Sequence, residues 1–379
     1  MKFLLKLISV FICCAVCVAL LGNNAKAYSV SAKGYVLINA DTGEVLAGEN
    51  IHKRLSMAST TKIMTAVLLA ELNTPEKEIV TTKEMVTVEG SSMGLLPGDM
   101  VSYYELLVGM LLPSGNDAAN CTAIAVAGSI EKFAELMNQK AKEIGMDNTH
   151  FVTPSGLDDP EHYSTAYDMA LLTMYALDFP VIRDIVSKSS ITVTFGNPPY
   201  QRTLYNHNKL LNSYDYCIGV KTGFTKKSGR CLVSAAEKEG VRVIAVTLNA
   251  PDDWNDHKYL LDYGLGYLKT KDITYSLPES TIPVVGGCDD SVTVSTERFL
   301  CGCTDNSAKQ ISAKYQILPF LYAPVKLGQT VGRVDYMYKG RIIHSSDIIT
   351  VGSVEQSVFK PTFKQRLIYY FKGIFKYFI

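Results

Sequence analysis

The first apolar pattern in the chain is a continuous run from Leu7 to Leu21, which follows two lysines and precedes Ala25-Lys26-Ala27. A positive start, a short apolar stretch and a small-x-small site are typical of a secretory signal peptide. The run is too short, and its flanks too polar, for a membrane span. We expect that residues 1–27 are removed on export and that the mature chain begins near Tyr28. An N-terminal anchor that is never cleaved is the alternative.

The next pattern predicts strands at both ends of one domain with helices between them. Short strand-like runs flank Asp41-Thr42-Gly43, which predicts a hairpin. A mostly helical block follows from about Ser59 to Leu177, and a closing helix covers about 253–267. The strand-like runs between the helices are residues 191–195, 217–222, 230–235 and 241–248. We therefore predict an α/β (α+β) domain over residues 28–275, in which the first hairpin and the late strands form an antiparallel sheet packed against a helical cluster.

The sequence pattern changes near Tyr275, where short β-rich runs begin to alternate with Gly, Asp, Asn and Pro. These runs are residues 282–285, 291–295, 313–317, 330–337 and 341–350. Their length and spacing predict a small all-β sandwich over residues 276–355. This part of the chain contains no cluster of residues that suggests catalysis, so we interpret it as a spacer.

The last segment, residues 356–379, has apolar side chains at steps of three and four, with basic residues between them. The apolar positions are Phe363, Leu367, Phe371, Ile374, Phe375 and Phe378. The charges exclude a conventional membrane span. The pattern predicts an amphipathic helix that lies in a membrane surface, with lysines toward anionic lipid. A helix docked on the protein's own surface is the alternative.

The charge distribution argues against nucleic acid as a partner. The whole chain carries 37 basic and 37 acidic residues, but residues 1–27 and 356–379 hold eight of the basic residues and no acidic one. Residues 28–355 therefore have a net charge of −8. A body with this charge does not attract a phosphate backbone.

The mature chain is expected to keep six cysteines, and export permits disulfides between them. They are Cys121, Cys217, Cys231, Cys288, Cys301 and Cys303. A domain of this size does not need disulfides, and free thiols or one small structural pairing remain open. No histidine stands at ligand spacing from Cys301-Gly302-Cys303. We predict no metal and no cofactor.

The chemistry begins with Ser59-Thr60-Thr61-Lys62, which precedes an apolar helical run. Three residues separate Ser59 from Lys62, so both side chains share one helical face and lie within hydrogen-bond reach. Ser59 is a candidate nucleophile and Lys62 its base. A lysine accepts a proton only when neutral, which requires burial and a nearby second cation. We assign the second cation to Lys221.

Two further motifs supply the remaining parts. In Ser114-Gly115-Asn116, Ser114 is expected to carry a proton to the leaving group, and Asn116 to hold Lys62 and a substrate amide. Lys221-Thr222-Gly223 is expected on a strand whose edge pairs with an extended peptide. Within it, Lys221 supplies charge and Thr222 binds a substrate carboxylate.

The same strand is expected to help form the oxyanion hole. The backbone N–H groups of Ser59 and Phe224 would bind the developing negative charge, and Gly223 leaves room for the substrate. Each of the three motifs alone has an ordinary structural explanation: a helix cap, a turn and a strand end. Their occurrence together, in this order and in fitting local contexts, indicates acyl transfer on a peptide-like carbonyl.

These motifs resemble those of the low-molecular-mass penicillin-binding proteins, the serine-type D-alanyl-D-alanine carboxypeptidases. The resemblance extends from Ala32 to the tail and is carried by residues 58–65, 113–119, 148–170 and 219–223. It implies a β-lactamase/transpeptidase-like domain that releases D-alanine from peptidoglycan stem peptides ending in D-Ala-D-Ala. It also implies covalent inhibition by β-lactam antibiotics, a C-terminal β domain and an amphipathic membrane anchor.

The chain departs from the family pattern at two places. An arginine that often assists carboxylate recognition is expected near Asp253-Trp254-Asn255 and is missing there, so that Arg202 or Arg230 is left as a substitute. Phe224 stands where some members have a polar residue.

Two other functions are open from the sequence. A class A β-lactamase would need a Glu-x-x-Leu-Asn segment after the second motif, and the chain has none. A catalytically silent, membrane-attached scaffold would have no chemical need to keep Ser59 and Lys62 together. His162 and His207 are expected near the cleft, where a structural role is favoured over a catalytic one.

Overall fold

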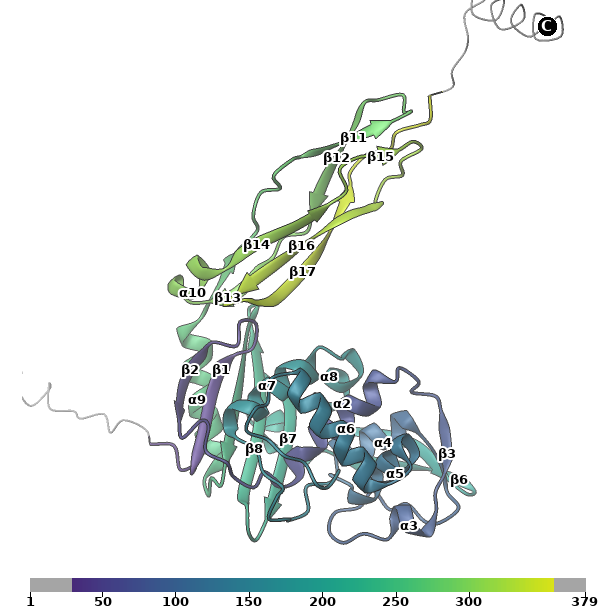
Figure 1. The fold of residues 1–379 in the computed structure, drawn as a ribbon. Helices are drawn as coiled ribbons and strands as arrows, with labels where there is room; N and C mark the ends of the chain where they lie inside the picture. Colours follow the sequence, from purple (N-terminus) through teal and green to yellow (C-terminus); the bar gives the residue numbers. More distant parts are fainter. Residues whose placement is uncertain (1–28, 358–379) are drawn as a thin grey trace, which may run out of the picture. The chain divides into compact units, whose positions relative to one another are not determined.

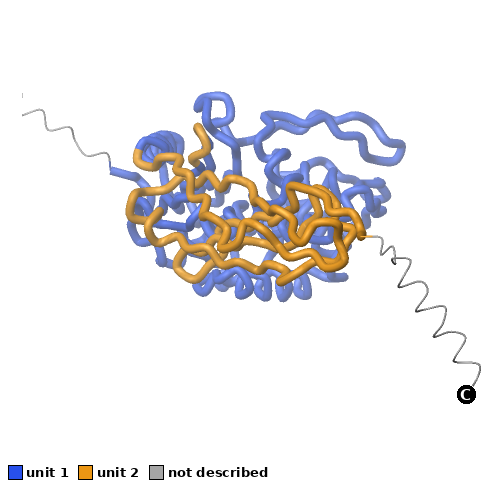
Figure 2. The backbone as a smooth tube through the Cα atoms, turned by 90° about the horizontal axis from the view of Figure 1, so that it is seen from above, with its two compact units in different colours: residues 1–237, 242–266 blue, residues 238–241, 267–379 orange. Residues whose placement is uncertain are grey.

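The computed structural model describes residues 29–357, and these form two compact units (Figure 2). Unit 1 contains residues 29–237 and 242–266, and unit 2 contains residues 238–241 and 267–357. The predicted signal peptide and all but the first two residues of the predicted amphipathic tail lie outside the described residues. No helix among residues 29–357 has the length and apolar character needed to cross a bilayer.

Unit 1 combines one five-stranded sheet with a cluster of helices (Figure 1). Its strands are β1 (Gly34–Asn39), β2 (Val45–Glu49), β3 (Glu78–Val80), β4 (Met100–Ser102), β5 (Ser190–Gly196), β6 (Pro199–Tyr205), β7 (Cys217–Thr225), β8 (Gly229–Lys238) and β9 (Val241–Leu248). Its α-helices are α2 (Lys62–Glu71), α3 (Lys83–Val86), α4 (Tyr103–Leu111), α5 (Asn116–Ala127), α6 (Ile130–Glu143), α7 (Ala166–Leu177), α8 (Pro180–Val186) and α9 (Asp253–Tyr267). Two short 3₁₀ helices are η1 (Ala58–Thr61) and η2 (Lys209–Asn212).

The main sheet has the strand order β2-β1-β9-β8-β7. Strand β1 pairs antiparallel with β2 through the predicted hairpin and antiparallel with β9 on its other side, with Val36 opposite Val246. The predicted pairing of the first hairpin with the late strands is therefore confirmed. The antiparallel sheet packed against helices confirms the predicted fold class.

The two faces of the sheet bury different partners because side chains alternate along a strand. Val36 and Ile38 of β1 belong to the large apolar core that includes α2, α4 and α5. Leu37 points the other way, toward α9, where it lies close to Gly264. A Cβ atom at Gly264 would lie 2.9 Å from Val243 Cγ1, so this glycine lets α9 approach the sheet closely.

Helix α2 lies at the centre of the helical cluster. Every residue from Lys62 to Leu69 is buried, and all of them are apolar except Lys62 and Thr65. A helix of this kind is stable only inside a larger core. The lysine at its first turn is consequently held in a region that excludes water.

The sequence analysis predicted only one of the two strands in the β5–β6 hairpin of unit 1. Strand β5 was predicted, but its antiparallel partner β6 was not. The alternation that marks a strand is weak in β6, because most of its side chains are exposed and Leu204 alone is buried. The hairpin forms a separate two-stranded sheet.

Unit 2 contains a six-stranded sheet with the order β14-β16-β17-β12-β11-β15 and a two-stranded sheet of β10 and β13. The strands are β10 (Lys269–Asp272), β11 (Thr281–Val285), β12 (Ser291–Thr296), β13 (Leu300–Cys303), β14 (Ser312–Ile317), β15 (Leu321–Tyr322), β16 (Thr330–Tyr338) and β17 (Arg341–Thr350). The predicted small β domain is confirmed. It also holds one short helix, α10 (Asp305–Gln310), which is too short to show a helical period in the sequence.

Our first prediction tests the close packing of α9. Replacing Gly264 with valine should lower the free energy of unfolding by about 1–3 kcal/mol, since the added atoms overpack the contact with Val243. Thermal unfolding followed by circular dichroism measures the change. Gly266→Val on the same helix is the matched control, because a Cβ atom there meets nothing within 4 Å. Equal destabilisation by both substitutions would contradict this account of the packing.

Candidate active site

Ser59 lies on η1, in the turn that leads directly into α2. Lys62 is the first residue of α2, so the two side chains stand one turn apart at the start of a buried helix. Lys62 Nζ lies 2.9 Å from Ser59 Oγ, the contact that the three-residue spacing predicts. The Ser59 hydroxyl also faces a cavity, which leaves it open to a substrate.

The Lys62 amine is surrounded by three oxygen atoms. Besides Ser59 Oγ, it lies 2.7 Å from Asn116 Oδ1 and 2.7 Å from the Ser155 carbonyl oxygen. A neutral amine has two N–H groups and one lone pair. The Asn116 amide oxygen and the Ser155 carbonyl oxygen can only accept hydrogen bonds. They therefore bind the two N–H groups of the amine and leave its lone pair for the Ser59 proton.

The electrostatic surroundings favour this neutral form. Burial lowers the pKa of Lys62 well below its ordinary value, and the nearby Lys221 lowers it further. The Asp117 carboxylate opposes this shift but does not reverse it. Lys62 is fully buried, so its charged form would lose nearly all its hydration.

Lys221 lies on β7, the strand at one edge of the main sheet. It is buried as well, and burial lowers its pKa to about 7. Within the described residues its ammonium donates one hydrogen bond, to the Thr222 carbonyl at 2.9 Å.

Ser114 and Asn116 lie between α4 and α5. Ser114 is buried, lines the cavity and has a φ of 64°, a left-handed conformation that is uncommon for serine. Asn116 begins α5, and its amide nitrogen donates to the Glu89 carbonyl at 2.7 Å. That bond orients the amide so that its oxygen faces Lys62.

Asp117 has a structural role at this site that we did not identify from the sequence. Its carboxylate accepts hydrogen bonds from the backbone N–H groups of Met93, Gly94 and Leu95 and from the Ser92 hydroxyl. It therefore ties a loop to the start of α5, and Ser91 of that loop lines the cavity. The signal was an acidic residue in the first turn of a helix, directly after Asn116.

A second supporting loop, residues 152–157, supplies the Ser155 carbonyl and was also missed. Its anchor is His162, which is buried: Nδ1 accepts from the Val152 N–H at 2.9 Å, so Nε2 carries the proton and donates to Thr61 Oγ1 at 2.8 Å. Burial lowers the pKa of His162 to about 4. The ring is consequently neutral at physiological pH and joins this loop to the turn that bears Ser59.

Two glycines allow the backbone around Ser59 to pack this tightly. Gly156 has a φ of 85°, and a Cβ atom there would lie 2.0 Å from the Ala58 carbonyl oxygen. A Cβ atom at Gly223 would lie 3.0 Å from the Met57 carbonyl oxygen and 3.1 Å from the Ser59 nitrogen. The glycine of the third motif is therefore required where β7 meets η1.

The cavity beside Ser59 has a volume of about 540 Å³. Its walls combine predicted residues with others that the sequence analysis did not place. The lining residues are Ser59, Ser91, Ser114, Asn206, His207, Lys209, Thr222, Gly223, Phe224, Arg230, Asp253 and Trp254. Lys62, Asn116 and Lys221 are buried and are not among them. Of the two histidines, His207 faces the cavity and His162 supports a loop.

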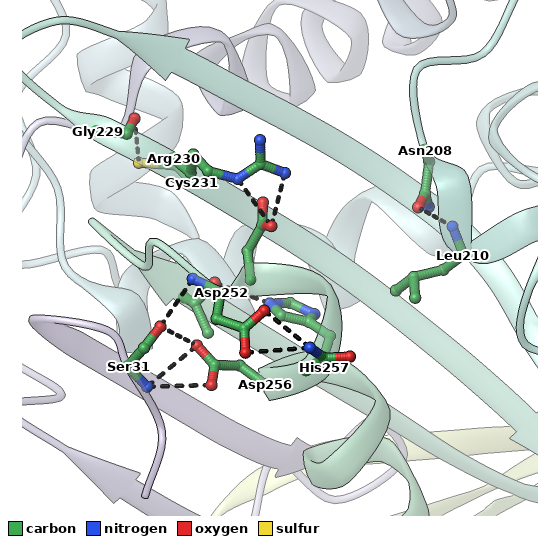
Figure 3. Close-up of polar contacts among 12 residues, drawn as sticks. Ser31, Asn208, Leu210, Gly229, Arg230, Cys231, Asp252, Asp256 and His257 are labelled. Carbon is green, nitrogen blue, oxygen red and sulfur yellow. Dashed lines mark hydrogen bonds and ion pairs between the residues drawn. The ribbon is translucent and has the colours of Figure 1, made fainter.

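Arg230 and Arg202, the two candidates for carboxylate recognition, lie in different surroundings. Arg230 lines the cavity, and its Nε and Nη2 donate to one Asp253 oxygen at 2.9 and 2.7 Å (Figure 3). Its guanidinium carbon also lies 5.4 Å from the centre of the Trp254 ring. Arg202 instead donates to the Gly94 carbonyl and does not line the cavity.

No group of three or more potential metal-binding side chains occurs among residues 29–357. A serine beside a buried lysine, in the wall of a cavity bordered by a sheet edge, is the arrangement of a serine enzyme that transfers acyl groups.

Comparison with known proteins identifies the family. The model of the peptidase S11 family, described as D-alanyl-D-alanine carboxypeptidase, matches residues 22–252, and the model of the penicillin-binding protein 5 C-terminal domain matches residues 269–356. The chain therefore belongs to the peptidase S11 family of D-alanyl-D-alanine carboxypeptidases.

Individual relatives agree with this assignment over nearly the whole chain. The D-alanyl-D-alanine carboxypeptidase DacC of Escherichia coli is 35% identical, with 89% of this chain and 88% of the relative covered. DacF of Bacillus subtilis is 30% identical over 91% of this chain and 92% of its own length. The structure of penicillin-binding protein 5 from Haemophilus influenzae covers 88% of this chain and all of its own, with 27% identity and a TM-score of 0.63.

Our second prediction concerns the neutral ring of His162. Its pKa is lower in the folded state than the ordinary 6.5 of the unfolded chain, so the unfolded state binds more protons between those values. The contribution to stability is complete above pH 6.5 and is lost as pH falls toward 4, by up to about 3 kcal/mol.

Chemical unfolding at pH 7 and at pH 4.5 measures this loss. The variant His162→Asn, which has no titrating ring, should be less stable at pH 7 and should lose less stability between the two pH values than the native chain. Equal losses in the two proteins would show that the ring does not contribute to the pH dependence.

Proposed function

We propose that this carboxypeptidase removes the terminal D-alanine from peptidoglycan stem peptides through an acyl-enzyme on Ser59. The observation that carries the proposal is the 2.9 Å contact between Ser59 Oγ and the fully buried Lys62 amine. A buried, neutral lysine can take the proton that makes a serine hydroxyl nucleophilic.

In the acylation step, Ser59 Oγ attacks the carbonyl carbon of the penultimate D-alanine and its proton passes to Lys62. The N–H groups of Ser59 and Phe224 stabilise the oxyanion. Ser114 then relays a proton to the nitrogen of the leaving D-alanine, and the peptide bond breaks. Water hydrolyses the resulting ester, which frees the shortened peptide and restores Ser59.

The free side of β7 is the proposed binding surface for the peptide. Among residues 29–357, β8 is the one strand that is hydrogen bonded to β7 in the main sheet, so the other edge of β7 can pair with an extended backbone. Asn116 is proposed to hold a substrate amide, in addition to Lys62. Lys221 supplies positive charge next to the reacting groups.

Arg230 is the better candidate for the terminal carboxylate, together with Thr222. It lines the same cavity as Ser59, whereas Arg202 does not. Asp253 and Trp254 hold the guanidinium in place, and the Asp253 bonds leave Nη1 free to donate. An arginine positioned in this way reduces the entropy lost on binding.

β-Lactam antibiotics are proposed as covalent inhibitors, because their strained amide presents a carbonyl and a carboxylate at a similar separation. A persistent acyl-enzyme would distinguish this protein from a β-lactamase. The family assignment does not favour a β-lactamase or a silent scaffold.

We also propose export and attachment to the outer face of the cytoplasmic membrane. The sequence of residues 1–27 supports export, and the basic and aromatic residues of the C-terminal segment support a peripheral contact with lipid. The three proposed partners then lie in the same compartment: the cell-wall peptide, the antibiotic and the membrane surface.

Our third prediction tests the nucleophile. Ser59→Ala should abolish both D-alanine release from a pentapeptide ending in D-Ala-D-Ala and covalent labelling by penicillin, since no other group replaces the hydroxyl. An enzymatic D-alanine assay and mass spectrometry of the intact protein measure the two outcomes. Ser91→Ala is a matched control in the same cavity wall and should keep labelling. Labelling of Ser59→Ala would overturn the assignment, and labelling of the native chain without D-alanine release would support the scaffold.

Our fourth prediction tests Arg230. Arg230→Met should lower kcat/KM for the pentapeptide by about 10–100-fold, because a charge-assisted hydrogen bond contributes about 1.5–3 kcal/mol. A pentapeptide with an amidated C-terminus should be equally poor for the native chain and for the variant. Arg202→Met should have a smaller effect on the acid substrate. An undiminished preference for the acid over the amide in Arg230→Met would exclude Arg230 as its receptor.

A further inference from the structure

Exposed apolar side chains gather at one end of unit 2. We call this set the apolar tip; it consists of Val285, Leu318, Phe320, Tyr322, Leu327 and Val351, which are between 45% and 71% exposed. Val285 ends β11 and Tyr322 ends β15, while the other four lie in the segments just before or after strands at the same end of the sheet. A contiguous patch of exposed apolar side chains usually marks an interaction surface.

Contacts on one side of the sheet hold Val285, Phe320 and Tyr322 together and fix the position of Leu318. Tyr322 of β15 pairs with Val285 at the end of β11. The rings of Phe320 and Tyr322 lie 5.4 Å apart, edge to face. Leu318 follows β14, and its N–H donates to the carbonyl of Val331 near the start of β16.

The other side of the tip is joined in the same way. The N–H of Gly328, directly after Leu327, donates to the carbonyl of Thr350, directly before Val351. The N–H of Val351 in turn donates to Thr293 on β12. These bonds hold loops from distant parts of the sequence at one end of the sheet.

The chain leaves unit 2 at this same end. The N–H of Ser357, the last described residue, donates to the carbonyl of Gly286, which directly follows Val285. Gln356 forms a bridge with Gly287, so these two residues complete the edge of the unit rather than begin the predicted tail helix. The segment 358–379 therefore starts next to the apolar tip.

The composition of that segment indicates which surface is close to the tip. Residues 358–379 contain five basic residues and no acidic one, with phenylalanine and tyrosine recurring throughout. Such a segment favours the boundary between lipid headgroups and acyl chains. Because the segment leaves unit 2 beside the tip, a surface that binds its first residues lies within reach of the tip.

We propose that the apolar tip inserts into the interface of a lipid bilayer as a second membrane contact, separate from the C-terminal segment. Phe320, Tyr322 and Leu327 supply apolar surface, and the tyrosine hydroxyl can remain at headgroup level. Charged residues beside members of the tip, in the sequence or in the sheet, include Lys326, Arg333, Asp289, Asp290, Asp347 and Glu355, which have no excess of positive charge. Binding by the tip is consequently apolar and insensitive to salt, unlike binding by the basic segment.

The test uses the full chain with the triple substitution Phe320→Ser, Tyr322→Ser and Leu327→Ser. Co-sedimentation with neutral phosphatidylcholine vesicles should show partitioning weakened about tenfold or more, by the same factor at low and high salt. All three side chains are at least 45% exposed, so folding and hydrolysis of a soluble pentapeptide should be unchanged.

The matched control replaces Leu300 and Ile342 with serine, since both are 54% exposed and lie away from the tip. Ile342 is eight residues from Thr350 along β17, a distance of about 26 Å. This control should bind vesicles like the native chain.

Three results would overturn the inference. Unchanged vesicle binding in the triple variant would exclude the tip as a membrane contact. Loss of binding after deletion of residues 358–379 would in that case still support the proposed attachment by the segment.

Stronger binding of the triple variant would show that the tip holds the segment against the protein. A native dimer that becomes a monomer on substitution, measured by sedimentation velocity without lipid, would identify a second copy as its partner. None of these results depends on the proposed catalytic mechanism.

Discussion

The central constraint in this protein is the burial of a lysine amine at the start of a helix that is itself largely buried. Water cannot reach Lys62, so its charge would be stabilised only by neighbouring groups, and these include another cation, Lys221. The pKa falls for this reason, and the amine is left with a lone pair toward Ser59. The surrounding structure serves this arrangement: Asn116 and the Ser155 carbonyl orient the amine, while Asp117 and His162 hold the loops on which the site depends.

The sheet edge and the cavity connect this chemistry to substrate recognition. Strand β7 carries the buried Lys221 and places Thr222, Gly223 and Phe224 in the cavity wall. The contact of Gly223 with the turn around Ser59 keeps the strand close to the nucleophile. Arg230 reaches the same cavity from β8, where it lies opposite Phe224. Two neighbouring strands, β7 and β8, therefore carry the proposed oxyanion, carboxylate and backbone contacts. Because the strands are paired, these contacts keep fixed positions relative to one another.

Sequence reasoning was most successful where a local pattern has one physical cause. The hairpin around Asp41-Thr42-Gly43, the closing helix α9 and the long strands of unit 2 follow from alternation, turn residues and apolar period, and all are present. It failed for β6, which is mostly exposed, and for α10, which is short. It also missed the supporting role of Asp117, which binds residues more than twenty positions away. A structural role for His162 was expected, but spacing does not reveal its partners, Thr61 and Val152.

The sequence by itself determined the reactive pair, because three residues on a helix place Ser59 and Lys62 side by side whatever else the chain does. It also determined the mixed fold class, through strand-like runs at both ends of a helical block. The tertiary structure decided which distant groups surround that pair. The protonation of an amine depends on its hydration and on charges in space, and neither can be read from positions along a chain. For the same reason, only the folded chain separates Arg230, which faces the cavity, from Arg202, which does not.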